Sequence, residues 1–291
     1  MNIPGRILKT TTADGLELDA ILFEPRTKSS SIVIHFHGKE GDFLQNHFVE
    51  RMAIDYPKAG YAYMTATHRG KSYMADFLRK SATGYEYTQL GSAFDIFEES
   101  EYDIDAWVSL AKKMGFQEII LQQHSTPQKI TWYTYNNPNS VSKLILVSPA
   151  DTLFAFEKYV TDYPANLKLA KKLVDQGKSK ELMPVALWSN CPVSAGTFYN
   201  WGNPNSHIQE FNYSHPEKAF KYFPKIKLPI FAVLGENDFA VGEPAQRCLD
   251  ILKEKSNSVN FASKVIKNAA HSYLGQEQEL TDTILQWLKK V

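Results

Sequence analysis

Cysteine is nearly absent from the 291-residue sequence, which contains only Cys191 and Cys248. Two cysteines so far apart fit neither a disulfide framework nor a closely spaced metal site, so both are interpreted as ordinary thiols. A net charge is also lacking, because lysine plus arginine and aspartate plus glutamate each total 32. No overall electric field would therefore draw the chain to nucleic acid or to an anionic membrane.

Long apolar runs and glycine-rich phosphate loops are missing as well. No segment approaches the roughly 20 apolar residues that span a bilayer, and residues 1–9 lack the apolar core of a secretory signal. We therefore expect a cytoplasmic protein with neither a membrane nor a nucleic acid as partner; the oligomeric state stays open. No Gly-x-Gly-x-x-Gly pattern occurs, so no cofactor is expected.

The sequence does contain enough apolar residues, 43%, for one substantial core. Residues 6–12 and 17–23 are β-rich and separated by Asp14-Gly15, which predicts an antiparallel hairpin because glycine tolerates the positive φ of a tight turn. Four short apolar runs follow at residues 31–36, 61–66, 118–122 and 143–147, with helix-length segments between them. This alternation predicts an α/β fold with a mostly parallel sheet and right-handed helical crossovers. Helical spacing of apolar residues predicts one such helix at 94–114.

The alternation stops near Asp151 and resumes with a strand at 228–234, a helix at 244–254, a strand at 260–266 and a helix at 276–290. We therefore predict a core formed by residues 1–150 and 226–291, with an insertion at 151–225. The insertion is rich in aromatic residues, asparagine and proline, and its clearest helical stretch is 166–174. A loop-rich aromatic insertion behind a strand predicts a lid over a site, and a peripheral subdomain is the alternative.

The most informative segment for chemistry is Leu-Gln-Gln-His-Ser-Thr-Pro-Gln at residues 121–128. A strand ends there, a polar turn centred on Ser125 follows, and residues 129–135 could continue as a helix; this arrangement exposes a serine hydroxyl above a sheet edge. A serine needs a base within hydrogen-bond reach, and that base needs an orienting partner. Asp238 follows a later strand, and His271 precedes the final helix, so both partners are available.

These features together resemble the α/β-hydrolase superfamily over nearly the whole chain. The resemblance is carried by the opening hairpin and by five motifs: His-Phe-His-Gly at 35–38, Thr-His-Arg-Gly-Lys-Ser at 67–72, the Ser125 turn, Gly-Glu-Asn-Asp at 235–238 and Ala-His at 270–271. It implies a Ser-His-Asp triad in the family's chain order, with Ser125 as nucleophile, His271 as base and Asp238 as orienting acid. It also implies that the backbone amides of Lys39 and Thr126 form the oxyanion hole.

The Ser125 turn departs from the usual Gly-x-Ser-x-Gly pattern, because Gln123 and Pro127 occupy the glycine positions. Gln123 must find space and a polar partner, whereas Pro127 fits the first helical turn. Each triad candidate has a structural alternative. Ser125 could cap the following helix, His271 could be a loop histidine bonded to backbone, and Asp238 could form a turn or exchange roles with Glu236.

Other residues are assigned by position. His37, Gly38, His124, Phe198 and Trp201 are candidate substrate-binding residues, and the aromatic residues of the insertion point to an apolar or aromatic substrate group. A metal site built from His35, His37, His68 and His124 is not expected, because no single element offers a ligand pair. Arg69 is expected to be structural.

The predicted function is hydrolysis of a carboxylic ester or thioester of a small acyl compound through an acyl-enzyme. One alternative passes the acyl group to an amine or alcohol, which makes the protein an acyltransferase or cyclase. A second alternative, motivated by Gln123 and Pro127, is a catalytically inactive protein of the same fold that binds a small molecule or a partner.

Overall fold

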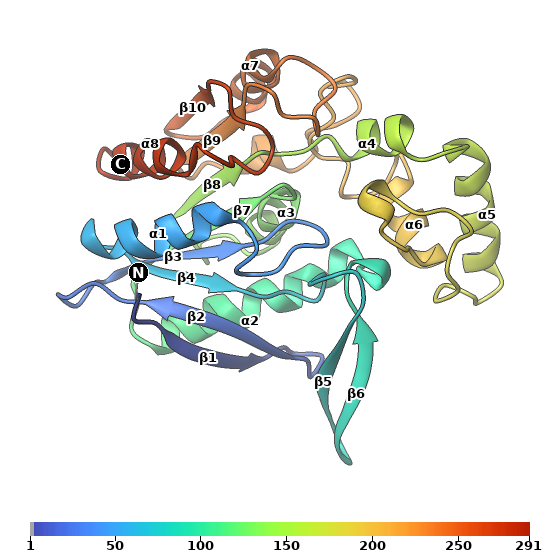
Figure 1. The fold of residues 1–291 in the computed structure, drawn as a ribbon, viewed down its shortest axis with the longest axis horizontal. Coiled ribbons are helices and arrows are strands. Elements are labelled where there is room, and N and C mark those ends of the chain that lie inside the picture. Colours follow the sequence, from blue (N-terminus) through green and yellow to red (C-terminus); the bar gives the residue numbers. More distant parts are fainter. Residues whose placement is uncertain (1–2) are drawn as a thin grey trace.

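The apolar runs of the sequence become strands of one central eight-stranded sheet in the computed structural model, which describes residues 3–291 (Figure 1). The strand order is β1-β2-β4-β3-β7-β8-β9-β10. These strands are β1 (Arg6–Thr11), β2 (Glu17–Phe23), β3 (Ser31–Phe36), β4 (Ala62–Ala66), β7 (Glu118–His124), β8 (Lys143–Val147), β9 (Ile230–Gly235) and β10 (Phe261–Ile266). Six of these strands, β4, β3, β7, β8, β9 and β10, run parallel to one another. The β1–β2 hairpin joins the sheet through an antiparallel pairing of β2 with β4.

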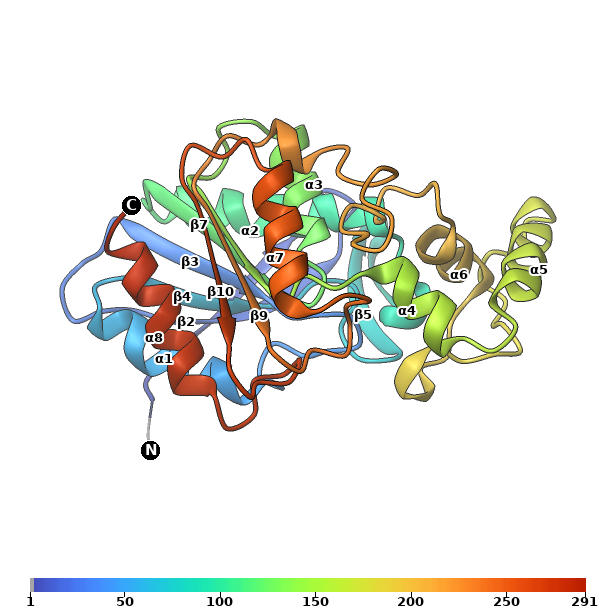
Figure 2. The same cartoon turned by 90° about the horizontal axis from the view of Figure 1, so that it is seen from above.

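Helices cover both faces of this sheet, which explains why every residue of β4, β8 and β9, and all but the first residue of β7, is buried. One face packs on α2 (Ser100–Lys113), α3 (Gln128–Asn136) and α7 (Ala245–Lys255). The other packs on α1 (His47–Lys58) and α8 (Glu277–Leu288), which lie side by side in Figures 1 and 2. The predicted mostly parallel α/β sheet with its opening hairpin is therefore confirmed.

The chain between β8 and β9 forms a lobe that projects beyond one end of the sheet in both views (Figures 1 and 2). It contains α4 (Thr152–Tyr159), α5 (Tyr163–Asp175) and α6 (Ala195–Gly202). The lobe has its own apolar core, in which Phe156 and Phe198 meet edge to face at 5.3 Å. Helix α5 includes the predicted stretch 166–174, whereas α4 and α6 were not predicted as helices.

Two features between β4 and β7 differ from the sequence prediction. A two-stranded hairpin, β5 (Ala75–Ser81) with β6 (Gly84–Leu90), protrudes from the body and was not predicted (Figure 1). The helix predicted to start at Phe94 is α2, which begins at Ser100, so its predicted start was wrong. Residues Asp95 and Ile96 are extended, and this breaks the segment into two short 3-10 turns followed by the helix.

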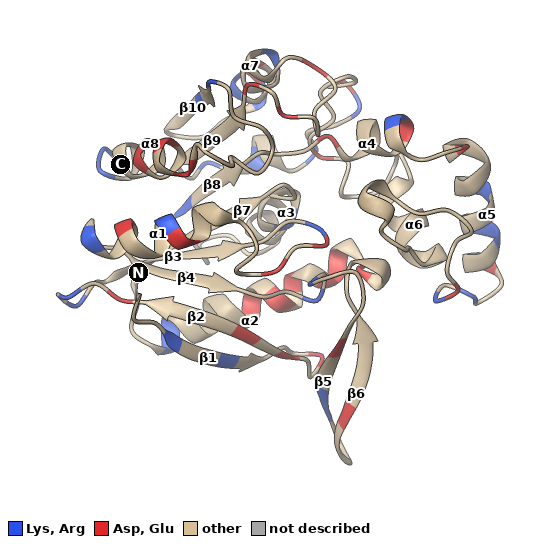
Figure 3. Ribbon diagram, in the orientation of Figure 1, with Lys and Arg blue, Asp and Glu red and all other residues tan. Residues whose placement is uncertain are grey.

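Charged residues of both signs, which total 32 each in the sequence, are interspersed along the ribbon (Figure 3). Helix α6 carries no charged residue, in keeping with its packing in the core of the lobe. Within residues 3–291, every helix is too short or too polar to cross a lipid bilayer.

Candidate active site

The turn between β7 and α3 holds Ser125 in a strained conformation above the end of the sheet. Its φ of 67° is in the left-handed region, which non-glycine residues rarely adopt. Backbone hydrogen bonds hold the turn to the neighbouring strand end, since the Ser125 amide donates to the Val147 carbonyl at 2.8 Å and the Ala150 amide donates to the Ser125 carbonyl at 3.0 Å. Strain of this kind is retained where surrounding structure enforces it, commonly at functional sites.

Three side chains from three separate loops form one hydrogen-bonded chain at this turn. Nδ1 of His271 lies 2.8 Å from Oδ1 of Asp238, and Nε2 of His271 lies 3.0 Å from Oγ of Ser125. Because the carboxylate accepts the Nδ1 proton, Nε2 is left to accept the serine hydroxyl proton. Glu236, the alternative acid, accepts instead from the Asn268 amide at 2.9 Å. This geometry would allow a serine to act as nucleophile, a histidine as its base and an aspartate as the orienting acid.

Burial and hydrogen bonds set the charges around His271. Asp238 is buried, which opposes its ionisation, but the charge of His271 and its hydrogen bond outweigh burial and lower the pKa of Asp238. The Ala240 amide also donates to Asp238 Oδ1 at 2.9 Å. His124 donates from Nε2 to the His271 carbonyl at 2.8 Å, and burial together with the nearby His271 lowers the pKa of His124 to about 3. A neutral His124 therefore braces His271 without adding a positive charge beside it.

The loop after β3 approaches Ser125 closely, and Gly38 permits this approach. A methyl group on Gly38 would lie 2.7 Å from Cβ of Ser125 and 3.2 Å from the His124 carbonyl oxygen. The next residue, Lys39, has a side chain that anchors the loop: its Nζ donates to the Ser92 carbonyl at 2.7 Å and lies 4.2 Å from the ring centroid of Trp201. The loop is thus tied both to the core and to α6 of the lobe.

The two amides assigned to the oxyanion hole differ in their hydrogen bonds. The Lys39 amide makes no hydrogen bond within the described part of the chain. The Thr126 amide donates to the His124 carbonyl at 2.7 Å, two residues back across Ser125. The Lys39 amide is therefore available to donate a hydrogen bond to an oxyanion. The Thr126 amide would have to share its proton between the oxyanion and the His124 carbonyl, or turn away from that carbonyl.

The turn forms with both unusual residues in place. Gln123 is buried, and its Nε2 donates to Oγ1 of Thr126 at 3.3 Å and to the His37 carbonyl at 3.4 Å. Pro127 precedes the first residue of α3 with a φ of −67°, and its carbonyl accepts the Thr131 amide at 3.0 Å. The amide nitrogen of Gln123 thus has polar partners, whereas its buried Oε1 has none within residues 3–291. Pro127 starts the helix without loss of a hydrogen bond.

A cavity of about 350 Å³ opens over Ser125 and His271. Its walls come from the loop after β3, from the lobe and from the loops that carry the acid and the histidine. Of the predicted substrate-binding residues, Gly38, His124 and Trp201 line it. Its wall also contains five residues that were not predicted from the sequence: Glu40, Gln45, Asn46, Trp188 and Phe239.

His37 and Phe198 were predicted to bind substrate, but the structure places both away from this cavity. The His37 ring stacks on the His68 ring at 4.0 Å, and burial lowers the pKa of His37 to about 4. Phe198 belongs to the core of the lobe. Arg69 is structural as expected, since its guanidinium binds the carboxylates of Asp14, Glu99 and Asp103. Across residues 3–291, no three His, Cys, Asp or Glu side chains are grouped as metal ligands.

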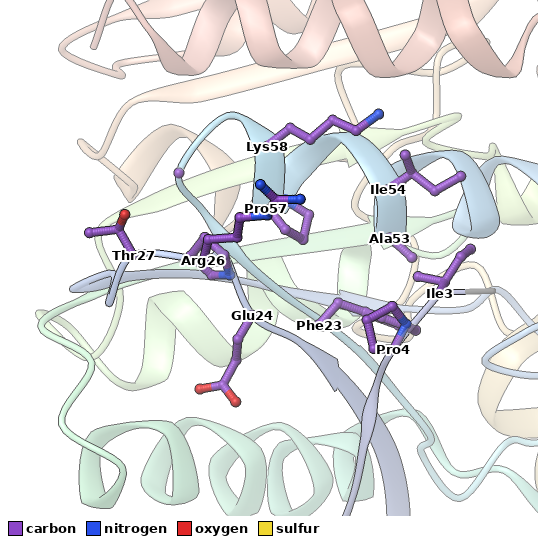
Figure 4. A pocket seen from close by; sticks show the side chains of 12 residues that line it. Ile3, Pro4, Phe23, Glu24, Arg26, Thr27, Ala53, Ile54, Pro57 and Lys58 are labelled. Atoms are coloured by element: carbon purple, nitrogen blue, oxygen red, sulfur yellow. The ribbon is translucent and has the colours of Figure 1, made fainter. Parts of the chain in front are cut away.

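A larger cavity of about 750 Å³ lies at the opposite end of the sheet, where the parallel strands begin (Figure 4). It lies between the end of α1 and the segment after β2, and residues from Phe23 to Thr27 form one side of it. It shares no lining residue with the Ser125 cavity among the described residues. Open α/β sheets bind ligands at the carboxyl ends of their strands, so the smaller cavity is the candidate site.

Comparison with protein families finds that the model of a family described as "Protein of unknown function (DUF1749)" matches residues 87–289. The sequence matches no functionally curated protein.

Solved structures give a more extensive match. Est1E from Butyrivibrio proteoclasticus is 15% identical, with 98% of both chains covered and a TM-score of 0.63. A highly thermostable carboxyl esterase from Bacillus coagulans is 14% identical, with 100% of this chain and 99% of that chain covered and a TM-score of 0.68. Monoglyceride lipase from Saccharomyces cerevisiae is 13% identical, with 100% and 97% covered and a TM-score of 0.66. The chain therefore has the α/β-hydrolase fold, as predicted.

Proposed function

Since the chain belongs to the DUF1749 family, whose description names no function, we propose one from the site: the protein is a serine hydrolase that cleaves a carboxylic ester or thioester of a small acyl compound. The observation that carries the proposal is the chain of hydrogen bonds from Asp238 through His271 to Ser125, at 2.8 and 3.0 Å. Its position at the floor of a cavity over the carboxyl ends of parallel strands supports the same conclusion.

The proposed reaction has two steps. His271 Nε2 takes the Ser125 proton as Oγ attacks the substrate carbonyl carbon, and the negative charge moves to the carbonyl oxygen. The Lys39 amide stabilises this oxyanion, and the Thr126 amide joins it if it turns from the His124 carbonyl. The leaving alcohol or thiol takes the proton from His271. Water, deprotonated by the same histidine, then attacks the acyl-enzyme, releases the acid and restores Ser125.

We further propose that the lobe between β8 and β9 acts as a lid. Tyr159 of α4, Trp201 of α6 and Trp188 between them contribute to the cavity wall. Because these side chains are large and mostly apolar, they would exclude water around a bound acyl group and favour a substrate with an apolar or aromatic portion.

The test is labelling with a fluorophosphonate, which reacts with activated serines, followed by location of the adduct by mass spectrometry. We expect an adduct on Ser125 in the wild-type protein, no adduct in Ser125→Ala and much slower labelling in His271→Ala and Asp238→Asn. In parallel, kcat for p-nitrophenyl acetate should fall by about 10⁴-fold or more in Ser125→Ala and His271→Ala. A folded wild-type protein that neither labels nor hydrolyses esters would contradict the proposal and favour an inactive binding protein.

A further inference from the structure

Glu40 is the only carboxylate among the described residues that line the Ser125 cavity. It directly follows Lys39, and its backbone φ is 64°, in the left-handed region. Glutamate rarely adopts this conformation, which costs free energy that glycine would avoid and asparagine would reduce. The loop therefore holds a glutamate at a position where its backbone is strained.

The carboxyl group of Glu40 carries a second energetic cost. Its Oε1 atom is buried and has no hydrogen-bond partner within residues 3–291. Burial raises the pKa of Glu40 to about 7, although the positive charge of Lys39 and the polar hydrogens of the nearby Cys191 thiol and Trp188 indole lower it. A buried oxygen without a donor destabilises a folded protein, and such groups in binding cavities are commonly satisfied by the ligand. Two costs at one residue indicate a function that compensates for them.

From the position and the missing partner of this carboxyl group, we infer that Glu40 is a specificity-determining residue that hydrogen-bonds a hydroxyl group of the substrate. The inference rests on the proposed hydrolase function, because it assigns a substrate feature to the same cavity. The substrate would then combine an ester or thioester at Ser125 with a hydroxyl group, and its apolar part would pack against the indole rings of Trp188 and Trp201.

A hydroxyl fits this environment better than an ammonium group does. Among the described residues of the cavity wall, Lys39 is the only basic side chain other than histidine. Its ammonium group already lies over the Trp201 ring, and its charge lowers the pKa of Glu40. A substrate cation beside Glu40 would be repelled by Lys39. A hydroxyl is neutral, and it can donate to the ionised carboxylate or accept from the protonated acid. It therefore pairs with both forms of a group that titrates near neutral pH.

The experiment measures kcat/KM for matched esters. The acyl series is p-nitrophenyl 3-arylpropanoates with a 4-hydroxyl, 4-methyl or 4-aminomethyl group on the ring. The alcohol series is the butanoates of 4-(hydroxymethyl)benzyl and 4-ethylbenzyl alcohol, so the two series show on which side of the ester the hydroxyl is recognised. We expect wild-type protein to prefer the hydroxyl compound by about tenfold to a hundredfold in one series, as for loss of one hydrogen bond to a charged group.

Variants at Glu40 separate recognition from folding. Glu40→Leu should abolish the hydroxyl preference, and Glu40→Gln, which keeps an acceptor oxygen, should retain part of it. Both should melt no lower than wild type, because each removes a buried carboxylate without a partner. The control Glu254→Leu makes the same change at an exposed position on α7 and should leave the preference intact.

The outcomes distinguish this inference from the proposed function. If hydrolysis does not depend on Ser125, the proposed function fails. If Ser125 is required but neither series shows a hydroxyl preference, or the preference survives in Glu40→Leu, the inference about Glu40 is overturned. A preference for the aminomethyl ester over the hydroxyl ester also overturns it.

Discussion

Substitution of Gly38 by alanine tests whether the close approach between the loop after β3 and the Ser125 turn is needed for activity. The added methyl group would lie 2.7 Å from Cβ of Ser125, whereas ordinary contacts between such atoms are 3.4–4 Å. The loop or the serine must therefore move by roughly 1 Å, and a displacement of that size in a catalytic geometry can cost about 100-fold in rate. The 3.0 Å contact between Ser125 Oγ and His271 Nε2 is the distance most directly affected.

The assay is steady-state hydrolysis of a p-nitrophenyl ester together with thermal melting. We expect kcat of Gly38→Ala to fall by about 100-fold, with KM changed much less because the rest of the cavity is unaltered. Gly115→Ala is the matched control: Gly115 has a φ of 92° and open space around it, so its alanine variant should lose about 1 kcal/mol of stability and keep full activity. A folded Gly38→Ala protein whose kcat is within threefold of wild type would refute the reasoning.

Two further predictions concern buried charges. Because burial raises the pKa of Glu40 from 4.5 to about 7, the folded state binds this proton more tightly than the unfolded state does. The free energy of unfolding should then fall as pH rises from 4.5 to 7, by at most about 3 kcal/mol. In urea unfolding, the stability gained by Glu40→Gln over wild type should be larger at pH 8 than at pH 5. Equal gains at the two pH values would contradict this prediction. Lys39 acts in the opposite direction by stabilising the carboxylate, and the neighbouring Cys191 and Tyr73 titrate above this range because burial raises their pKa values. The second prediction concerns the buried ion pair between Lys129 and Asp95, in which Nζ lies 2.6 Å from Oδ2. Lys129→Met alone should lower the free energy of unfolding by about 3–5 kcal/mol, because it leaves a buried carboxylate unpaired. The double variant Lys129→Met with Asp95→Leu should lower it by less. A double variant less stable than the single one would show that the unpaired carboxylate is not the cause.

The sequence predicted most of the sheet because strands covered on both faces carry continuous apolar runs. β8, for example, is Lys-Leu-Ile-Leu-Val and fully buried. The β5–β6 hairpin was missed because its two strands are largely exposed, with only Phe77 buried, so they show no apolar run. A strand that packs against little of the core leaves little hydrophobic pattern in its sequence.

The candidate site was predictable only in part. Ser125, Asp238 and His271 each follow a strand, so the sequence order and the resemblance to a family were enough to group them, and their catalytic roles stay predictions. Glu40 could not be found this way, because its environment is created by Trp188 and Cys191, about 150 residues away in the chain. The position of His37 outside the cavity wall has a similar origin, since its stacking on His68 depends on how two loops meet.

The core and the lobe each contribute a separate part of the cavity wall, and this separation affects how the substrate range of such a protein can evolve. The core loops supply Ser125 and His271, while α4, α6 and Trp188 come from a single continuous segment between β8 and β9. Recombination or exchange of that one segment would replace much of the wall and leave Ser125 and His271 in place. Under the proposed function, selectivity and reactivity would be encoded in separable stretches of the gene, and a chimera that carries a relative's segment would acquire a new substrate range in one step.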